Sequence, residues 1–155
     1  MEKEIIIVRT FDAPVTLVWE AWTKAENVSK WWGPKGFNTK VKKLDFRPGG
    51  QWEYVMIDEK GNEYPAIGVF REIVPFEKII SSDDFGEEFK SSTDMDLPKP
   101  MLFTTLFEDL GDKTKLTLIY EHASAEDRAK HEKMGVVSGW NSSLDKLAEY
   151  MIATK

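Results

Sequence analysis

Residues 134–151, MGVVSGWNSSLDKLAEYM, carry the longest apolar stripe in the chain. On a helical wheel, one face of this stretch collects Met134, Val137, Trp140, Leu144, Leu147 and Met151. Upstream, Ser124 can cap a helix, and the acidic residues Glu126 and Asp127 would lie in its first turn. The pattern predicts one long C-terminal helix with a buried face.

Two glycines, Gly135 and Gly139, lie within this predicted helix but off its apolar stripe. A glycine in a helix interior costs roughly 1 kcal/mol relative to alanine. Their presence indicates either a local bend or the close approach of a neighbouring segment, and both interpretations stay open.

The middle of the chain shows the two-residue period of β-strands. In QWEYVMID, residues 51–58, the side chains of Trp52, Tyr54 and Met56 fall on one face. Further strands are predicted at residues 4–11, 37–46, 63–73, 77–85, 101–109 and 114–122. The polar, proline-containing residues 86–100 are predicted to form a long mobile loop.

Two short helices are predicted directly after the first strand. Asp12 can cap the first helix and Pro14 suits its first turn. Residues 26–32, ENVSKWW, continue as a second helical turn, which ends at Gly33-Pro34 because proline disfavours a helical residue before it.

The order of these elements predicts a single α+β domain over residues 1–155. A six- to seven-stranded antiparallel sheet would bury one face against the C-terminal helix, the only long apolar stripe available to cover it. One helix cannot fill a twisted sheet completely, so a pocket walled by large side chains is expected between them.

Composition excludes several classes of function. The chain has 155 residues, no cysteine and a net charge of −6, which removes disulfides and thiolate catalysis and disfavours nucleic-acid binding. No signal peptide, membrane span or lipidation motif is found, so we expect a cytoplasmic protein without membrane insertion, either a monomer or a weak dimer. No phosphate, dinucleotide, zinc-protease or serine-hydrolase motif occurs, and we expect no cofactor and no metal.

Aromatic residues mark the candidate pocket. The chain has six tryptophans, and WWGPKGF at residues 31–37 pairs two of them at the predicted hinge from helices to sheet, where the segment would also form a lip on the cavity. The residues expected to line the pocket are Trp22, Trp32, Phe37, Trp52, Tyr54, Met56, Phe70, Leu118, Tyr120, Val137, Trp140 and Leu144.

Candidate catalytic residues are few. His122 shares a strand face with Tyr120 and could act as a base at the pocket mouth, although a plain strand-end residue is the simpler interpretation. His131 lies among charged residues and is expected to be exposed. Asp45 and Glu72 are possible pocket acids, whereas the acidic residues 83–88 indicate a solvated loop.

Four stretches of the chain resemble a known family. They are FDAPVTLVWEAWTKAENVSKWWGP, FRPGGQWEYVM, GVFREIVPFEKII and GWNSSLDKLAEYM. They are similar to the C-terminal domain of the activator of heat-shock protein 90 ATPase, within the START-like, birch-pollen-allergen-like (SRPBCC) superfamily. The resemblance implies a helix-grip fold with an apolar cavity, in a stand-alone member of bacterial type.

Three functions follow from this resemblance and the residues. The first is binding of a small hydrophobic or aromatic ligand, such as a lipid, a polyketide or a flavonoid-like molecule, in the internal cavity. The second is a co-chaperone-like module that binds a chaperone of the heat-shock protein 90 type. The third is an enzyme of the cyclase or hydrolase kind that uses pocket acids and His122.

Overall fold

The computed structural model describes residues 3–85, 93 and 97–154. In chain order, the elements of this part are β1 (Glu4–Phe11), α1 (Val15–Thr23), α2 (Ala25–Trp31), β2 (Asn38–Leu44), β3 (Gln51–Ile57), β4 (Glu63–Val74), β5 (Lys78–Phe85), β6 (Met101–Asp109), β7 (Thr114–Glu121), α4 (Ala125–Lys133) and α5 (Val136–Thr154). The predicted loop at residues 86–100 lies largely outside the described residues. None of the described helices is long and apolar enough to cross a membrane.

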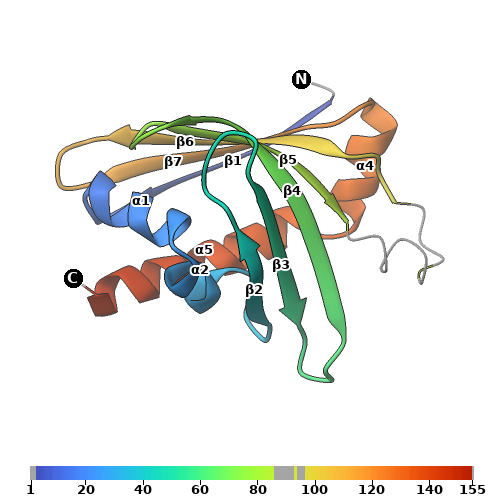
Figure 1. The fold of residues 1–155 in the computed structure, drawn as a ribbon, viewed down its shortest axis with the longest axis horizontal. Helices are drawn as coiled ribbons and strands as arrows, with labels where there is room; N and C mark the ends of the chain where they lie inside the picture. The colour runs from blue at the N-terminus through green and yellow to red at the C-terminus, as the bar shows by residue number, and fades with distance from the viewer. Residues whose placement is uncertain (1–2, 86–92, 94–96, 155) are drawn as a thin grey trace.

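The strands form one antiparallel sheet in the order β1-β7-β6-β5-β4-β3-β2. Strands β2 to β7 each pair with the next strand in the chain, and β1 pairs with β7. The two edge strands of the sheet are therefore β1 and β2. The sheet curls around α5, which crosses its concave side with α1 and α2 near one end and α4 near the other (Figure 1). The α+β class, the antiparallel sheet and its position against the C-terminal helix are therefore confirmed.

The long C-terminal helix is confirmed as α5, but its predicted start after Ser124 is wrong, because a separate helix, α4, precedes it. Helix α4 ends at Lys133, Gly135 adopts a φ of +87°, and α5 begins at Val136. Gly135 therefore marks a bend, because its backbone conformation is one that other residues rarely adopt. Gly139 lies inside α5 with no atom within 4 Å of the position that a Cβ would take, so it marks neither a bend nor a close approach.

The predicted helix cap at Ser124 is confirmed, and the predicted cap at Asp12 is wrong. Ser124 accepts a hydrogen bond from the Asp127 amide, as its position predicts. Asp12, however, does not cap α1, since Pro14 is the N-cap residue and no side chain caps this helix. The extended ψ of Pro14, 155°, places the helix cap two residues later than expected.

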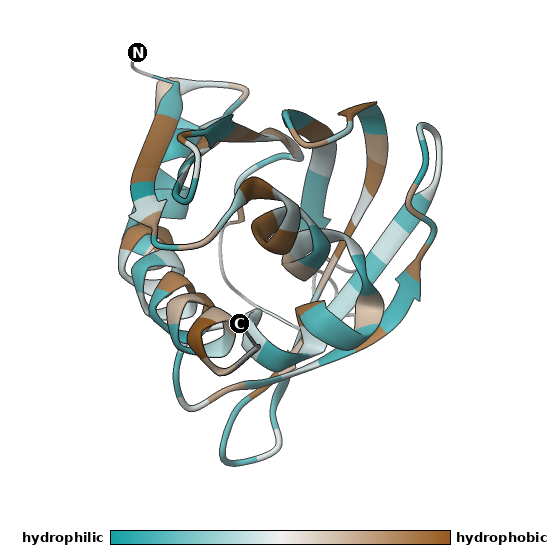
Figure 2. Ribbon diagram, turned by 90° about the vertical axis from the view of Figure 1, so that its left-hand side faces the viewer, coloured by the Kyte–Doolittle hydropathy of each residue, from teal (hydrophilic) through white to brown (hydrophobic). Residues whose placement is uncertain are grey.

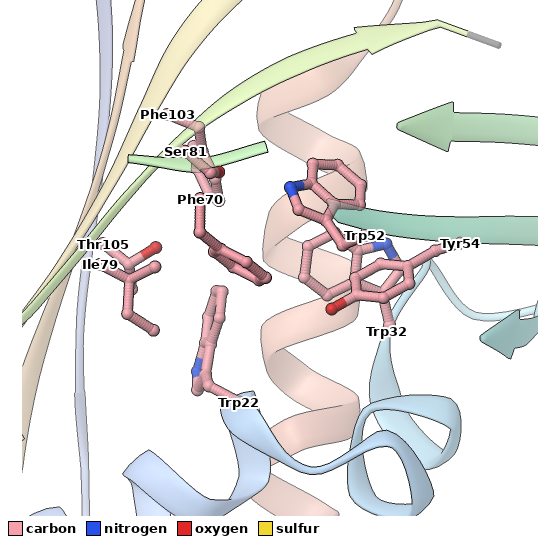
Figure 3. Close-up of a pocket in the computed structure, with 9 residues that line it drawn as sticks. All are labelled: Trp22, Trp32, Trp52, Tyr54, Phe70, Ile79, Ser81, Phe103 and Thr105. Carbon is pink, nitrogen blue, oxygen red and sulfur yellow. The ribbon is translucent and has the colours of Figure 1, made fainter. Parts of the chain in front are cut away.

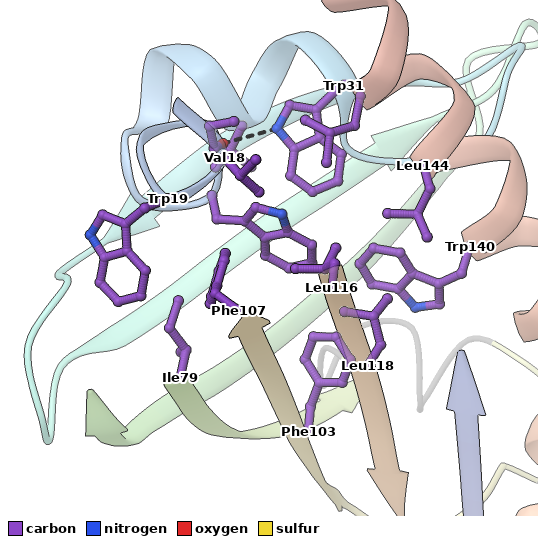
Figure 4. Close-up of a cluster of buried hydrophobic side chains, with 14 of the residues drawn as sticks. Val18, Trp19, Trp31, Ile79, Phe103, Phe107, Leu116, Leu118, Trp140 and Leu144 are labelled. Atoms are coloured by element: carbon purple, nitrogen blue, oxygen red, sulfur yellow. Dashed lines mark hydrogen bonds between the residues drawn. The ribbon is translucent and has the colours of Figure 1, made fainter. Parts of the chain in front are cut away.

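The core lies between the sheet and three of the helices. Along α5, side chains spaced three or four residues apart are buried: Trp140, Leu144, Leu147 and Met151. Trp140 and Leu144 face Leu118 and Phe103 of the sheet (Figure 4). Met134 and Val137 are each 37% exposed, because the bend at Gly135 interrupts the predicted stripe before Trp140.

Hydrophobic and hydrophilic residues alternate along the strands and around α5 (Figure 2). This alternation is the pattern expected when one face of each element is buried. It explains why strand positions could be predicted from period alone.

Candidate functional site

A small pocket lies between the sheet and the helices, with the side chains of Trp22, Phe70 and Trp52 turned toward a common space (Figure 3). It is lined by Trp22 of α1, Trp32 directly after α2, Trp52 and Tyr54 of β3, Phe70 of β4, Ile79 and Ser81 of β5, and Phe103 and Thr105 of β6. Five of these nine residues were predicted from the sequence. The inward faces of four adjacent strands bring them together.

The pocket is narrow because aromatic rings occupy most of the interior. Its cavity volume is about 30 Å³, enough for one or two water molecules and far below the 300–1,000 Å³ typical of sites for drug-sized ligands. The rings of Trp22 and Trp140 stack with centroids 5.7 Å apart and an interplanar angle of 8°. Any organic ligand must therefore displace side chains as it enters.

Seven of the predicted pocket residues lie outside this lining. Leu118 and Leu144 are fully buried core residues, and Trp140 donates a hydrogen bond to the Tyr120 hydroxyl over 2.9 Å. Phe37 packs edge-on against Tyr64 with ring centroids 5.8 Å apart. Met56 lies beside Gly33, and Val137 is on the surface at the start of α5. The bend at Gly135 accounts for the position of Val137.

The WWGPKGF segment links α2 to β2 and is tied to α5. Trp31 is fully buried, and its indole donates to the Ala21 carbonyl over 2.9 Å, while Trp32 reaches the pocket. The Ser143 hydroxyl bridges the segment, accepting from the Gly33 amide at 3.1 Å and donating to the Trp31 carbonyl at 3.2 Å. The paired tryptophans thus divide into one core residue and one pocket residue.

The Lys146 ammonium adds a second tie to this segment. It donates to the carbonyls of Gly33 and Phe37 over 3.0 and 3.3 Å. Burial lowers the pKa of Lys146. These bonds tie the segment that follows Trp32 to the C-terminal helix α5.

The two histidines form a buried pair at the other end of the sheet. The Nε2 atom of His122 lies 2.9 Å from the Nδ1 atom of His131, and the two residues are 6% and 8% exposed. The prediction that His131 is exposed is wrong, because α4 folds back over the end of β7. His122 lies inside the fold and also contacts the Lys3 carbonyl at 2.7 Å.

Asp83 lies near the end of β5, on the same inward face as Ser81. It is half-buried, and burial raises the pKa of its carboxyl to about 7; a hydrogen bond from Tyr120 opposes this shift and the charge of Asp84 adds to it. The solvated-loop interpretation is therefore wrong for Asp83, whose strand position places it beside Tyr120.

The two acids proposed from the sequence face away from the pocket. Asp45 accepts from the Arg47 guanidinium over 2.9 Å. Glu72 is exposed and pairs with Lys78 across the β4–β5 turn. Both pairs are local ion pairs at the surface, so neither carboxylate is a pocket acid. No group of three or more metal-ligating side chains occurs in the part of the chain that the structure describes.

Sequence reasoning missed Ile79, Ser81, Phe103 and Thr105. Their strands were predicted, and alternation places each of them on the same face as a neighbouring apolar residue. That signal identifies the inward face of β5 and β6. It does not reveal which inward positions border empty space, because this depends on how far Trp22 and Trp52 reach.

Comparisons with known proteins give a consistent assignment. The family model described as Activator of Hsp90 ATPase homolog 1-like protein matches residues 12–151. No curated protein matches the chain at a significant level.

Solved bacterial structures share the fold over nearly the whole chain. A protein from Arthrobacter aurescens is 24% identical with a TM-score of 0.89, covering 98% of this chain and 87% of that one. Protein Ms6760 from Mycobacterium smegmatis is 27% identical with a TM-score of 0.83, covering 96% and 90%. The AHSA1 protein from Silicibacter pomeroyi is 23% identical with a TM-score of 0.76, covering 98% and 99%.

Proposed function

The chain belongs to the Activator of Hsp90 ATPase homolog 1-like family, and from this premise we propose that it binds a small, largely apolar or aromatic molecule in the pocket between sheet and helices. The observation that carries the proposal is the aromatic lining. Trp22, Trp32 and Trp52 come from three separate segments and converge on one cavity.

The nature of this lining favours a compact, planar ligand. Rings of Trp32 and Tyr54 meet edge to face with centroids 4.9 Å apart, and Trp22 meets Trp32 in the same way at 5.9 Å. A flat aromatic molecule can enter such a cluster by replacing ring–ring contacts with equivalent ones. A polyketide- or flavonoid-like molecule fits this requirement better than a long acyl chain, which needs a continuous channel.

The proposal is tested with protein purified from its own host and with an added probe. Native mass spectrometry is expected to show a bound small organic molecule. A titration with α-tetralone, a bicyclic aromatic ketone, should give saturable shifts in the amide resonances of residues 79–81 and 103–105. Shifts confined to exposed residues, with no co-purified molecule, would refute an internal ligand.

An enzymatic role is a second candidate, favoured by Asp83. A half-buried carboxyl with a pKa of about 7 beside the Tyr120 hydroxyl has the properties of a general acid or base. Turnover of a bound ligand that is lost in Asp83→Asn, with ligand affinity retained, would establish it. For an enzymatic role, Asp83 would replace Asp45 and Glu72 as the candidate acid, although it does not itself line the pocket.

A chaperone-binding role is the third candidate. The edge strand β1 exposes two apolar side chains, Ile6 at 49% and Val8 at 51%, which provide a surface for a protein partner. Binding of a chaperone of the heat-shock protein 90 type that is weakened by Ile6→Ser, with ligand binding unchanged, would support this role. We propose a cytoplasmic location for any of the three roles.

A further inference from the structure

Two buried hydrogen-bond donors in the pocket wall have no acceptor. The indole N–H groups of Trp22 and Trp52 are buried and make no hydrogen bond within the described residues. The two residues are 7% and 4% exposed, and both line the pocket. Because an indole nitrogen can only donate, each group lacks a partner that this environment would be expected to supply.

Two other buried tryptophans of the same cluster, Trp31 and Trp140, have satisfied indole N–H groups. The Trp31 indole donates to the Ala21 carbonyl and the Trp140 indole to the Tyr120 hydroxyl, each over 2.9 Å. The fold therefore provides acceptors for buried indoles in the core. The two buried indole N–H groups without acceptors, those of Trp22 and Trp52, both belong to residues that line the pocket.

The remaining polar groups of the lining are hydroxyls. Tyr54, Ser81 and Thr105 make no hydrogen bond through their side chains in the described part of the chain. Burial raises the pKa of Tyr54, so its hydroxyl stays protonated and can donate. The lining contains no carboxylate, amide or cationic side chain. Each hydroxyl can both donate and accept, whereas the buried indoles of Trp22 and Trp52 can only donate and therefore require an acceptor.

We propose that the pocket selects a neutral aromatic molecule that carries a carbonyl or ether oxygen, which accepts a hydrogen bond from the indole of Trp22 or Trp52. An acceptor oxygen supplies what the buried indoles lack. An anionic ligand is disfavoured because no cationic side chain lines the pocket and a buried unpaired charge is strongly destabilising. The inference rests on the proposed function and specifies its ligand class.

Three probes with nearly the same skeleton separate these requirements. Tetralin is a bicyclic hydrocarbon, α-tetralone adds only a ketone, and α-naphthoate adds a charged carboxylate. We expect α-tetralone to bind at least about tenfold more tightly than tetralin, a difference of about 1.4 kcal/mol. We expect α-naphthoate to bind more weakly than α-tetralone.

The indole N–H resonances report the contact directly. The resonance of Trp22 or Trp52 should move downfield on addition of α-tetralone and not of tetralin. Those of Trp31 and Trp140 serve as internal controls, since both groups already donate to protein acceptors. Trp22→Phe and Trp52→Phe assign the resonances and remove one donor each while keeping an aromatic ring. In at least one of them the preference for the ketone over the hydrocarbon should fall toward equality.

The outcomes separate this inference from the proposed function. Equal affinity for tetralin and α-tetralone, without downfield indole shifts, leaves an internal ligand site but overturns the acceptor requirement. If the indole protons instead donate to a water molecule while the ketone is bound, the acceptor requirement is overturned as well. Tightest binding by α-naphthoate contradicts the neutral class. Internal binding of none of the three probes refutes the proposed function itself. If a phenylalanine variant fails to fold, the wild-type spectra still decide.

Discussion

The Nδ1 atom of His131 in α4 lies 2.9 Å from the Nε2 atom of His122, the residue that follows β7, in a buried contact. The Lys3 carbonyl, 2.7 Å from the Nδ1 atom of His122, can only accept, so this nitrogen carries a proton. In the neutral pair His122 therefore accepts through Nε2 and His131 donates. If both rings were protonated, two N–H groups would face each other across the contact.

This geometry predicts that acid destabilises the protein. Burial and the charge of His122 lower the pKa of His131 from 6.5 to about 4. Between these values the unfolded chain binds more protons than the folded one, so stability is complete above the unfolded pKa and falls as the pH drops toward the folded one. We expect a loss of up to about 3 kcal/mol, measured by urea denaturation across this range. His131→Gln should show a flatter pH dependence, and an unchanged slope would contradict the assignment to His131.

We expect the substitution Gly68→Ala to lower the free energy of unfolding of the protein strongly. A Cβ at this position would lie 2.1 Å from the Ser82 carbonyl oxygen and 2.3 Å from the Trp52 indole nitrogen. Because one of these atoms belongs to the backbone, relief requires the sheet to move, and overpacking of this kind typically costs about 1–3 kcal/mol. Thermal and chemical denaturation would measure the change in the free energy of unfolding.

Gly139→Ala is the matched control for Gly68→Ala. Position 139 lies inside α5, and no atom lies within 4 Å of the added Cβ. Alanine should therefore stabilise the protein by about 0.5–1 kcal/mol through helix propensity alone. A similar loss of stability at both glycines would show that local packing does not decide the effect.

The two hydrogen bonds of the Ser143 hydroxyl predict that this residue anchors the WWGPKGF segment to α5. Ser143→Ala would leave the Gly33 amide and the Trp31 carbonyl without their present partner, at a cost of about 1–3 kcal/mol. Amide hydrogen exchange at Gly33 should accelerate with it. Ser138→Ala, on the exposed first turn of α5, should change stability by less than about 0.5 kcal/mol. Equal effects of the two substitutions would argue against an anchoring role.

The elements that could be predicted from sequence are those with a strong local pattern. The alternation around Trp52 and Tyr54 places them on the inward face of β3, and the Ser124 cap follows from its position before two acidic residues. Both depend on residues close together in the chain. The order of the elements then limits the sheet to an antiparallel arrangement around the last helix.

The features that could not be predicted depend on contacts between distant segments. His131 has charged neighbours in the chain, and only its contact with β7 makes it buried. Val137 fits the helical spacing of the apolar stripe, but the positive φ of Gly135 separates α4 from α5 just before it. The hydrogen-bonding state of each tryptophan likewise depends on acceptors from other elements, which composition does not reveal.

A substitution at Ser81 tests the central claim, an internal ligand site, most directly. Ser81 is 4% exposed and borders the cavity of about 30 Å³. Valine suits a strand and adds apolar volume there, so Ser81→Val should hold or raise stability as empty space is replaced by contact. It should weaken α-tetralone binding by about tenfold or more.

The decisive measurement is the dissociation constant of α-tetralone for the wild type, Ser81→Val and Ser138→Val, with each variant's stability measured in parallel. Position 138 is exposed, so the second variant controls for the substitution itself. An internal site predicts unchanged affinity in Ser138→Val and a loss of about tenfold or more in a stable Ser81→Val. Equal affinity of all three proteins would contradict it.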